Sequence, residues 1–329
     1  SPSMFVGGIS SSDWDTLSSE EANYPLMNRA IAGQYPSGST IKALTTFAGL
    51  KYGICDGNSS WYCTGFWTGF GEQYGMHCWL LSGHGTVNLI TGITNSCDIV
   101  FYEIGKGFFY NNDHPEGMQE TFRAFGLGAL SGIDLPEEAS GRVPDAEWKW
   151  NYFTSSPDDA RKWQGGDNCN LAIGQGDLLV TCLQMANAYC GIANRGPIYK
   201  PHVLKSINAR NGNGSVIEYK NEVILTPEEK DEHRDIVARG LYGVVYEESA
   251  SQTIHWTNLD VTVNGKTGTA EQQSIGEPVG WFVGYAPADK PQYVVAANLD
   301  CAPSGAGSGM YIVRDVFGAI YNQPDNVGR

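Results

Sequence analysis

The stretch YPSGSTIKALTTF, residues 35–47, joins a turn signal to the start of an amphipathic helix. Its PSG segment is turn chemistry, and the apolar residues after it recur at helical spacing. The apolar face of this helix consists of Ile41, Leu44 and Ala48. Ser39 and Lys42 stand three positions apart, so their side chains meet on the first turn. A serine beside an amine at a helix start is either a cap with a solvated neighbour or an activated nucleophile.

Length and composition limit the classes of protein to which the chain can belong. It has 329 residues, of which 41% are hydrophobic, enough for one large domain or two small ones. The formal net charge of −15 repels nucleic acid and no basic stripe occurs, so we expect no nucleic-acid partner. No run approaches the roughly 18 apolar residues of a membrane span, and no signal peptide is visible at Ser1.

Eight cysteines raise the question of disulfides or metal binding. They are Cys55, Cys63, Cys78, Cys97, Cys169, Cys182, Cys190 and Cys301. Cys63, Cys78 and Cys97 form a loose group in the sequence with two histidines, His77 and His84. Because no CxxC pair occurs, a Cys63–Cys78 disulfide or reduced buried thiols are favoured over a zinc site, which stays open as an alternative.

Patterning along the chain predicts helices in the middle and an antiparallel sheet towards the end. Expected helices cover about 25–31, 39–50, 86–95, 98–106, 115–125, 178–193, 226–246 and 310–320. Expected strands cover about 263–270, 279–286 and 293–298, with a hairpin over 202–220. Elsewhere we expect an irregular N-terminal segment over 1–34, an ordered loop or small hairpin over 51–85 and a surface excursion over 130–168. This order of elements indicates an α+β fold.

A second element, NSCDIVFYEIG, starts at Asn95 and places two polar side chains at a helix break. Ser96 and Asp98 stand two positions apart, and in an extended loop such side chains point the same way. Both can therefore face one cleft, although serine and aspartate are also simply good helix caps.

The third element, VNGKTGTAEQ, has the pattern of a strand that begins near Val263. Alternation puts Lys266 and Gly268 on one face and Thr267 and Thr269 on the other. A glycine inside a strand often marks the close approach of another backbone. A lysine and two hydroxyls suit a peptide with a free carboxylate that adds as an extra strand, although a lysine can also simply blunt an edge strand.

Taken in order, SxxK, SxD and KTGT are close to the motif set of serine acyl-enzymes, and the chain resembles the transpeptidase domain of class B penicillin-binding proteins. The segments IGQGDLLVTCLQMANAY, NRGPIYKPHV and GWFVGYAPADKPQYVVA extend the resemblance over essentially the whole chain. It implies the penicillin-binding protein/serine β-lactamase-like transpeptidase fold: an antiparallel sheet flanked by helices, plus an all-helical subdomain. It also implies one transpeptidase domain over residues 1–329, without the N-terminal anchor, the pedestal domain and the first β-hairpin of the family.

The resemblance implies a role for each motif residue. The implied catalytic residues are the nucleophile Ser39, its base Lys42, the proton relay Ser96, and Lys266. The implied substrate-binding residues are Asp98, Thr267, Gly268 and Thr269, and the backbone N–H groups of Ser39 and Thr269 would form an oxyanion hole. A base must be a neutral amine, which burial of Lys42 beside the Lys266 cation would favour.

The resemblance also implies a reaction and a setting. The reaction is the cross-linking of peptidoglycan stem peptides that end in D-Ala-D-Ala, with β-lactam antibiotics as acylating inhibitors and without cofactor or metal. The setting is the outer face of the bacterial cytoplasmic membrane, with a membrane glycosyltransferase as partner of the full-length protein. Asp98 stands where the family usually has an amide, and Cys182 where it usually has proline. Asp98 could still accept hydrogen bonds from Lys42 or from a substrate amide.

Other enzymes share parts of this pattern. A serine β-lactamase needs a base that activates a deacylating water, and Glu137, Glu138 and Glu147 lie in the right span without a recognisable loop context. A D,D-carboxypeptidase has all three motifs, so the sequence leaves this alternative open.

Non-catalytic functions are also open. A β-lactam sensor domain keeps the serine, the lysine and the KTG strand. A peptide-binding module would use Trp61, Trp67 and Trp79 as an aromatic surface, but these side chains are more simply a small core under a long loop.

Overall fold

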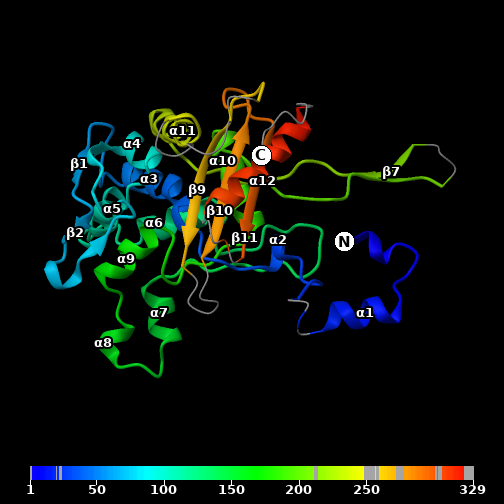
Figure 1. Cartoon of the computed structure of the whole chain (residues 1–329), viewed down its shortest axis with the longest axis horizontal. Coiled ribbons are helices and arrows are strands. Elements are labelled where there is room, and N and C mark those ends of the chain that lie inside the picture. The colour runs from blue at the N-terminus through cyan, green and yellow to red at the C-terminus, as the bar shows by residue number, and fades with distance from the viewer. Residues whose placement is uncertain are drawn as a thin grey trace.

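The computed structural model describes residues 2–19, 21, 24–210, 214–247, 256, 259–271, 278–300, 302 and 306–321. In this part of the chain, strands β9, β10 and β11 form a sheet with helices packed against it, and a second group of helices lies beside the sheet (Figure 1). The fold is therefore mixed α and β, as the sequence predicts.

The main sheet is antiparallel, with β10 in the middle. In the order β11–β10–β9, its strands are Tyr293–Leu299, Val279–Ala286 and Asn264–Ala270. Every residue of β10 is buried because both of its faces are covered. Trp281 faces the core that contains α10 (Cys182–Ala193), whereas Phe282 faces the core that contains α12 (Ala306–Ile320). The strand β10 therefore joins the two hydrophobic cores formed by the described residues.

The second group of helices is built around α3 (Lys42–Lys51) and α5 (Asp98–Phe109). The other members are the 3-10 helix η3 (Gly38–Ile41), α4 (Leu89–Thr94), α6 (Gly117–Ala124) and α9 (Gly165–Ala172). Helix α5 contacts α9, α3 contacts α6, and α4 contacts α11 (Asp231–Tyr246) next to the sheet. All residues of α3 except the last are buried, so the helix that follows Ser39 runs through the core.

Short strands and turns complete the described part of the chain. Residues 60–88 form two small antiparallel pairs, β1 (Ser60–Cys63) with β4 (Gly85–Asn88) and β2 (Phe66–Trp67) with β3 (Met76–His77). The remaining elements are η1 (Pro2–Phe5), α1 (Ser11–Ser18), α2 (Arg29–Ala32), η4 (Glu72–Tyr74), α7 (Ala146–Tyr152), α8 (Asp158–Arg161), β5 (Ile198–Tyr199), β6 (Ser206–Asn208), β7 (Ser215–Glu218) and β8 (Val223–Leu225). The β6–β7 hairpin and α1 extend away from the main body (Figure 1).

The structure corrects several predicted element boundaries. Helix α11 begins at Asp231 instead of near 226, because the side chain of Glu229 is buried against His233 and does not cap a helix start. Helix α10 begins at Cys182 instead of near 178, after a capping box formed by Thr181 and Gln184. The prediction of an irregular N-terminal segment was wrong, since this segment contains α1. The surface excursion over 130–168 contains the short helices α7 and α8 and the start of α9.

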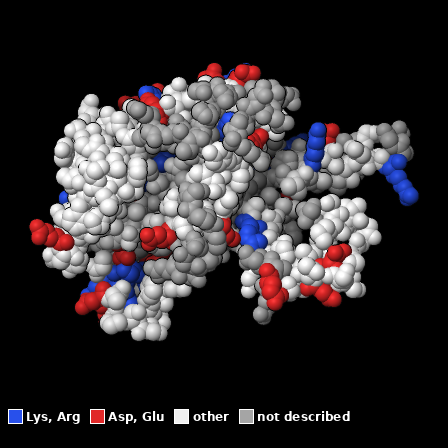
Figure 2. All heavy atoms as spheres, viewed as in Figure 1, with Lys and Arg blue, Asp and Glu red and all other residues white. Residues whose placement is uncertain are grey.

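Charged side chains are scattered over the face drawn in Figure 2, in small groups separated by uncharged surface. None of the described helices combines the length and the apolar character that a membrane crossing requires.

Candidate active site

Ser39 lies in the short 3-10 helix η3, which runs directly into α3. The turn before it depends on Gly38, whose φ of +51° is in the left-handed region that favours glycine. A Cβ atom on Gly38 would stand 2.6 Å from the carbonyl oxygen of Thr269. The turn that carries Ser39 is therefore in direct contact with strand β9, which is far away in the sequence.

Lys42 is fully buried and donates to three oxygen atoms. Its Nζ lies 2.7 Å from Asp98 Oδ1, 3.2 Å from Ser96 Oγ and 2.8 Å from the Ser96 carbonyl oxygen. The three acceptors match the three donors of an ammonium group. The structure thus joins the first and second motifs, and it confirms the expectation that Asp98 can hold Lys42.

Ser96 occupies the break between α4 and α5. Its φ of +52° is uncommon for a residue with a side chain, so the expected extended loop is instead a tight left-handed turn. The next residue, Cys97, precedes α5, and Asp98 is the first residue of that helix. Ser96 and Asp98 still converge, because both contact the Lys42 amine. The second oxygen of Asp98 accepts a hydrogen bond from the Trp79 backbone N–H at 2.9 Å.

Strand β9 carries the third motif with the predicted alternation. Lys266 and Gly268 are buried, whereas Thr267 is half-buried and Thr269 is exposed. A Cβ atom on Gly268 would stand 2.8 Å from the Ser37 carbonyl oxygen. The structure thus confirms the prediction that this glycine marks a close backbone approach.

Lys266 is buried without an acidic partner in the described part of the chain. Its Nζ donates to the Thr267 carbonyl oxygen at 3.2 Å and to the Thr267 hydroxyl at 3.3 Å. Burial lowers the pKa of Lys266 well below its ordinary value, and the neighbouring Lys42 charge lowers it further. The motif set therefore contains two buried amines, of which one is ion-paired and one is not.

Two aromatic side chains that hold the nucleophile turn were missed by sequence reasoning. The indole of Trp281 donates to the Pro36 carbonyl oxygen at 2.9 Å, and the Tyr189 hydroxyl donates to the Thr40 carbonyl oxygen at 2.9 Å. Both side chains are fully buried. The only signal in the sequence is the presence of aromatic residues with a polar tip in apolar segments, since such residues need a partner when buried.

Comparison with known protein families decides the identity of the fold. The penicillin-binding protein transpeptidase domain matches residues 9–321. The chain belongs to this family. The peptidoglycan D,D-transpeptidase MrdA of Acinetobacter baumannii is 32% identical, over 96% of this chain and 46% of that protein. The chain therefore spans about half the length of the curated relatives it matches.

Solved structures of penicillin-binding proteins share the fold. PBP2 of Pseudomonas aeruginosa, in complex with WCK 5153, matches with a TM-score of 0.81 and 27% identity, over 98% of this chain and 69% of that chain. A complex of PBP2 and MreC from Helicobacter pylori matches with a TM-score of 0.79 and 27% identity, over 98% and 56%. These findings confirm the predicted penicillin-binding protein/β-lactamase-like fold.

The acidic residues considered for a β-lactamase have other surroundings in this transpeptidase domain. Glu138 accepts hydrogen bonds from the backbone N–H groups of Ser131 and Gly132, at 2.8 and 3.0 Å. Its carboxylate therefore holds a loop. Glu147 lies in the first turn of the short helix α7. These positions weaken the β-lactamase alternative.

A cluster of three thiols and one imidazole lies directly behind the second motif. The ligand atoms of Cys63, Cys78, His84 and Cys97 all lie within 4.8 Å of one another. The Nδ1 atom of His84 is 3.5 Å from the Cys63 sulfur and 3.6 Å from the Cys78 sulfur. All described cysteines are free thiols, so the Cys63–Cys78 disulfide alternative was wrong. His77 is not part of the cluster.

The geometry of the cluster fits a tetrahedral zinc ion. With Zn–N near 2.0–2.1 Å and Zn–S near 2.3 Å, ligand nitrogen and sulfur atoms stand about 3.5 Å apart. The two measured N–S distances agree with this value. Three cysteines and one histidine are also a donor set of structural zinc centres. A hydrogen bond with the Cys97 thiol lowers the pKa of Cys78 to about 5, which favours the thiolate that a metal requires.

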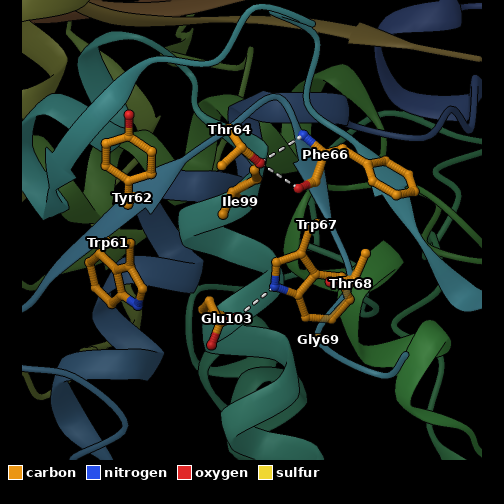
Figure 3. A pocket seen from close by; sticks show the side chains of 9 residues that line it. All are labelled: Trp61, Tyr62, Thr64, Phe66, Trp67, Thr68, Gly69, Ile99 and Glu103. Atoms are coloured by element: carbon orange, nitrogen blue, oxygen red, sulfur yellow. Dashed lines mark hydrogen bonds between the residues drawn. The ribbon is translucent and has the colours of Figure 1, made fainter. Parts of the chain in front are cut away.

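A pocket lies beside α5, away from the Lys42 contacts of the second motif (Figure 3). It has a volume of about 360 Å³ and is lined mainly by aromatic side chains and threonines of residues 61–69, with Ile99 and Glu103 from α5. The Trp67 indole donates to Glu103 at 2.6 Å and is buried, which confirms its core role. Trp61 is half-buried, whereas Trp79 is 56% exposed and was wrongly expected in this core. None of the eight predicted site residues lines this pocket.

Proposed function

We propose that this chain is the catalytic domain of a peptidoglycan D,D-transpeptidase that works through a Ser39 acyl-enzyme and is acylated by β-lactams. The observation that carries the proposal is the convergence of the three motifs: Lys42 contacts Ser96 and Asp98, and the Ser39 turn contacts strand β9. The relatives support it, since those named MrdA are peptidoglycan D,D-transpeptidases.

The donor substrate is a stem peptide that ends in D-Ala-D-Ala. It adds along β9, which is an edge strand of the main sheet in the described residues. Its terminal carboxylate is bound by Lys266, Thr267 and Thr269. Gly268 contributes by the absence of a side chain, because this lets the Ser37 backbone lie against β9 and sets the distance from the strand to Ser39.

Acylation begins with attack of Ser39 Oγ on the penultimate carbonyl of the donor. The backbone N–H groups of Ser39 and Thr269 stabilise the oxyanion, and their proximity is supported by the contact between Gly38 and Thr269. Lys42 passes its own proton to the neutral Lys266 amine and takes the proton of Ser39, and Ser96 relays a proton from these amines to the amine of the departing D-alanine. A side-chain amine of a second stem peptide then attacks the ester and closes the cross-link.

The two buried amines of the active site allow it to accept a proton. Lys42 and Lys266 are fully buried, and among the described residues one carboxylate, that of Asp98, lies close by. If both amines carried protons, the buried site would hold one uncompensated charge, which is costly. The lowered pKa of Lys266 has the sign that this argument requires. The two amines together therefore hold one proton fewer than they can bind, so the site can accept the proton of Ser39. Because the amines interact, their titration is a property of the pair.

The setting proposed for the full-length protein follows from its relatives. The Helicobacter pylori PBP2 structure is a complex with MreC. We propose that the full-length protein acts at the outer face of the cytoplasmic membrane, with a partner of this kind and a membrane glycosyltransferase that supplies glycan strands.

Labelling with a fluorescent penicillin tests the role of Ser39. In the full-length protein, intact mass is expected to increase by one penicillin per chain, and the S39A variant is expected not to label. The S82A variant is the control, since Ser82 is an exposed serine outside the motifs. Equal labelling of S39A and wild type would refute the assignment of the nucleophile.

Product analysis separates the transpeptidase from the other acyl-enzymes. With a pentapeptide donor and an amine acceptor, the proposal expects a cross-linked product that depends on Ser39. Release of D-alanine without cross-linking would indicate a carboxypeptidase, and rapid turnover of nitrocefin would indicate a β-lactamase. A chain that labels but forms no product from either donor would be a sensor.

A further inference from the structure

A groove, which we call the α5 groove, runs along one side of helix α5. Two adjoining pockets of about 360 and 220 Å³ form it, and they share Trp61 and Glu103 as lining residues. On the helix itself the groove is lined by Ile99, Glu103 and Tyr110, which stand at helical spacing on one face. Pockets with aromatic walls and a few convergent polar groups are typical ligand sites.

Aromatic side chains form the walls of the α5 groove. Trp61 is half-buried, whereas Tyr62 is 70% exposed and Phe66 is exposed as well. In Figure 3, Trp61 and Trp67 lie on opposite sides of Glu103. The faces of such rings carry partial negative charge, so they attract the weakly positive C–H bonds on the flat side of a sugar ring.

The polar groups of the groove match those of an N-acetylated amino sugar. The Glu103 carboxylate accepts from the Trp67 indole at 2.6 Å and from Lys106 at 3.4 Å, and its remaining lone pairs can accept from a ligand. The Trp61 indole N–H has no partner among the described residues, and Figure 3 shows its nitrogen on the side of Glu103. An acetamido group offers an N–H to the carboxylate, a carbonyl oxygen to the indole and a methyl group to Ile99.

The charges of the groove favour a neutral ligand over a cation. Aromatic rings around a carboxylate would also suit an ammonium group, which binds over the faces of such rings. Among the residues that line the groove, however, the charged ones are Glu103 and Lys106, and these form an ion pair at 3.4 Å. The lining therefore carries no net charge, which suits an uncharged sugar.

We propose that the α5 groove binds the glycan strand that carries a stem peptide, through the N-acetylated amino sugars of that strand. The proposal rests on the proposed transpeptidase function and adds a second contact with the same substrate. Stem peptides are attached to the sugars of peptidoglycan, so the domain meets the glycan whenever it meets the peptide. Strand β9 binds the peptide, and the α5 groove binds the sugars.

The position of the groove relative to the second motif supports this assignment. Asp98, the first residue of α5, contacts Lys42, and the next residue, Ile99, lines the groove. Successive side chains of a helix point about 100° apart, so the groove lies around the side of α5 from the Lys42 contacts. From Ile99 to Tyr110 the helix rises about 16 Å, which is longer than a single sugar ring. A glycan along α5 therefore brings its peptide branch to the end of the helix that carries the second motif.

Binding of a glycan without peptide tests the groove directly. The probe is a tetrasaccharide of alternating N-acetylglucosamine and N-acetylmuramic acid, titrated into the full-length protein by calorimetry. Saturable binding is expected for the wild type, and the W61A variant is expected to bind about 10-fold more weakly, because an aromatic anchor is lost. The W150A variant is the matched control, since it removes a partly exposed tryptophan of α7 that does not line the groove, and it should bind as the wild type does. Cellotetraose, which has no acetamido groups, should bind the wild type about 10-fold more weakly than the probe.

Cross-linking kinetics connect the groove to the reaction. The ratio of the KM for a glycan-linked donor to the KM for the free stem peptide is expected to rise about 10-fold in W61A and to stay unchanged in W150A. A general defect of folding would alter the kinetics of both donors and leave this ratio unchanged. Because Trp61 packs partly against the core, the Y62A variant repeats both measurements with a more exposed ring of the same groove.

Several results would overturn the glycan assignment. These are a wild type that does not bind the tetrasaccharide, equal binding by the wild type and the folded groove variants, and binding of cellotetraose as tight as that of the probe. Binding of a free stem peptide that W61A and Y62A weaken, with glycan binding unchanged, would assign the groove to peptide instead. If W61A does not fold, Y62A decides. Failure of Ser39 to label with penicillin while the glycan still binds would count against the proposed transpeptidase function and leave the groove assigned.

Discussion

The two sides of the candidate active site each hold a fully buried lysine, but the lysines have different partners. On the helical side, Lys42 forms an ion pair with Asp98 and two hydrogen bonds to Ser96. On the sheet side, Lys266 donates only to oxygens of Thr267 among the described residues. The pKa of Lys266 is lowered, first by burial and then by the Lys42 charge.

This difference shows how one type of residue can serve two functions in one cleft. The partners of Lys42 fix its position and make its charge part of a network. Within the described ranges Lys266 has no such carboxylate, so a carboxylate from outside is the partner that would compensate its charge. The helical side is therefore expected to carry stability and proton transfer, and the sheet side to carry substrate recognition.

Among the predicted effects, removal of the Asp98 carboxylate should reduce stability the most. In the D98A variant, Lys42 loses its ion pair inside the core. The expected loss in the free energy of unfolding is about 3–5 kcal/mol, because an uncompensated buried charge remains. Urea unfolding of the purified protein measures this loss, and the penicillin acylation rate should fall with it.

The D98N variant is the matched control for the charge. Its amide oxygen can accept from Lys42 or from the Trp79 N–H, but Asp98 accepts from both. It should therefore be destabilised less than D98A. Equal stability of D98A and wild type would show that the ion pair does not hold the helical side together.

Addition of a side chain at Gly268, on the sheet side, should reduce stability by an intermediate amount. In the G268A variant, the new Cβ would stand 2.8 Å from the Ser37 carbonyl oxygen and 3.1 Å from the Trp281 Cβ. The expected cost is about 1–3 kcal/mol of unfolding free energy, because a packed contact must open. Acylation should slow as well, since β9 moves away from the Ser39 turn.

Gly166 supplies the control for this substitution, because nothing lies within 4 Å of its Cβ position in α9. The G166A variant should be as stable as the wild type or up to about 1 kcal/mol more stable, since alanine favours helix. Full acylation by G268A would contradict the idea that β9 must lie close to Ser39.

The smallest expected effect concerns the pH dependence of stability. The folded-state pKa of Lys266 is lowered, so between this value and its ordinary value the folded chain binds one proton fewer than the unfolded chain. The contribution of Lys266 to stability should therefore rise with pH in this window, by up to about 1.4 kcal/mol per pH unit. The K266M variant should lack this contribution.

Urea unfolding of wild type and K266M at several pH values above neutrality measures the difference. The gap in the free energy of unfolding between the two proteins should change with pH in favour of the wild type. Parallel curves would mean that Lys266 keeps an ordinary pKa, and that the two lysines do not differ as proposed.

The sequence located most of the main sheet and all three motifs. The strands expected over 263–270, 279–286 and 293–298 lie at β9, β10 and β11 with shifts of no more than one residue. This works because the strand period and the turns between strands are encoded in adjacent residues. The start of α11 was missed because a tertiary contact of Glu229 replaced the local capping pattern.

The thiol cluster shows what local patterns leave open. Its spacings follow no compact metal motif, so the sequence favoured a disulfide or free thiols over a metal site. The four side chains come from the ends of β1, β3 and β4 and from the start of α5, and only folding brings these loops together. The same holds for Trp281 and Tyr189, whose partners lie far away in the chain.

The order of most elements, the motif residues and the family could be predicted from the sequence, because each depends on runs of a few neighbouring residues. Tertiary structure decided which buried lysine has a carboxylate, which glycine lies against which carbonyl, and where the thiols meet. The physical reason is that a buried polar group takes its partner from whatever packs against it, and packing joins segments that no local pattern connects.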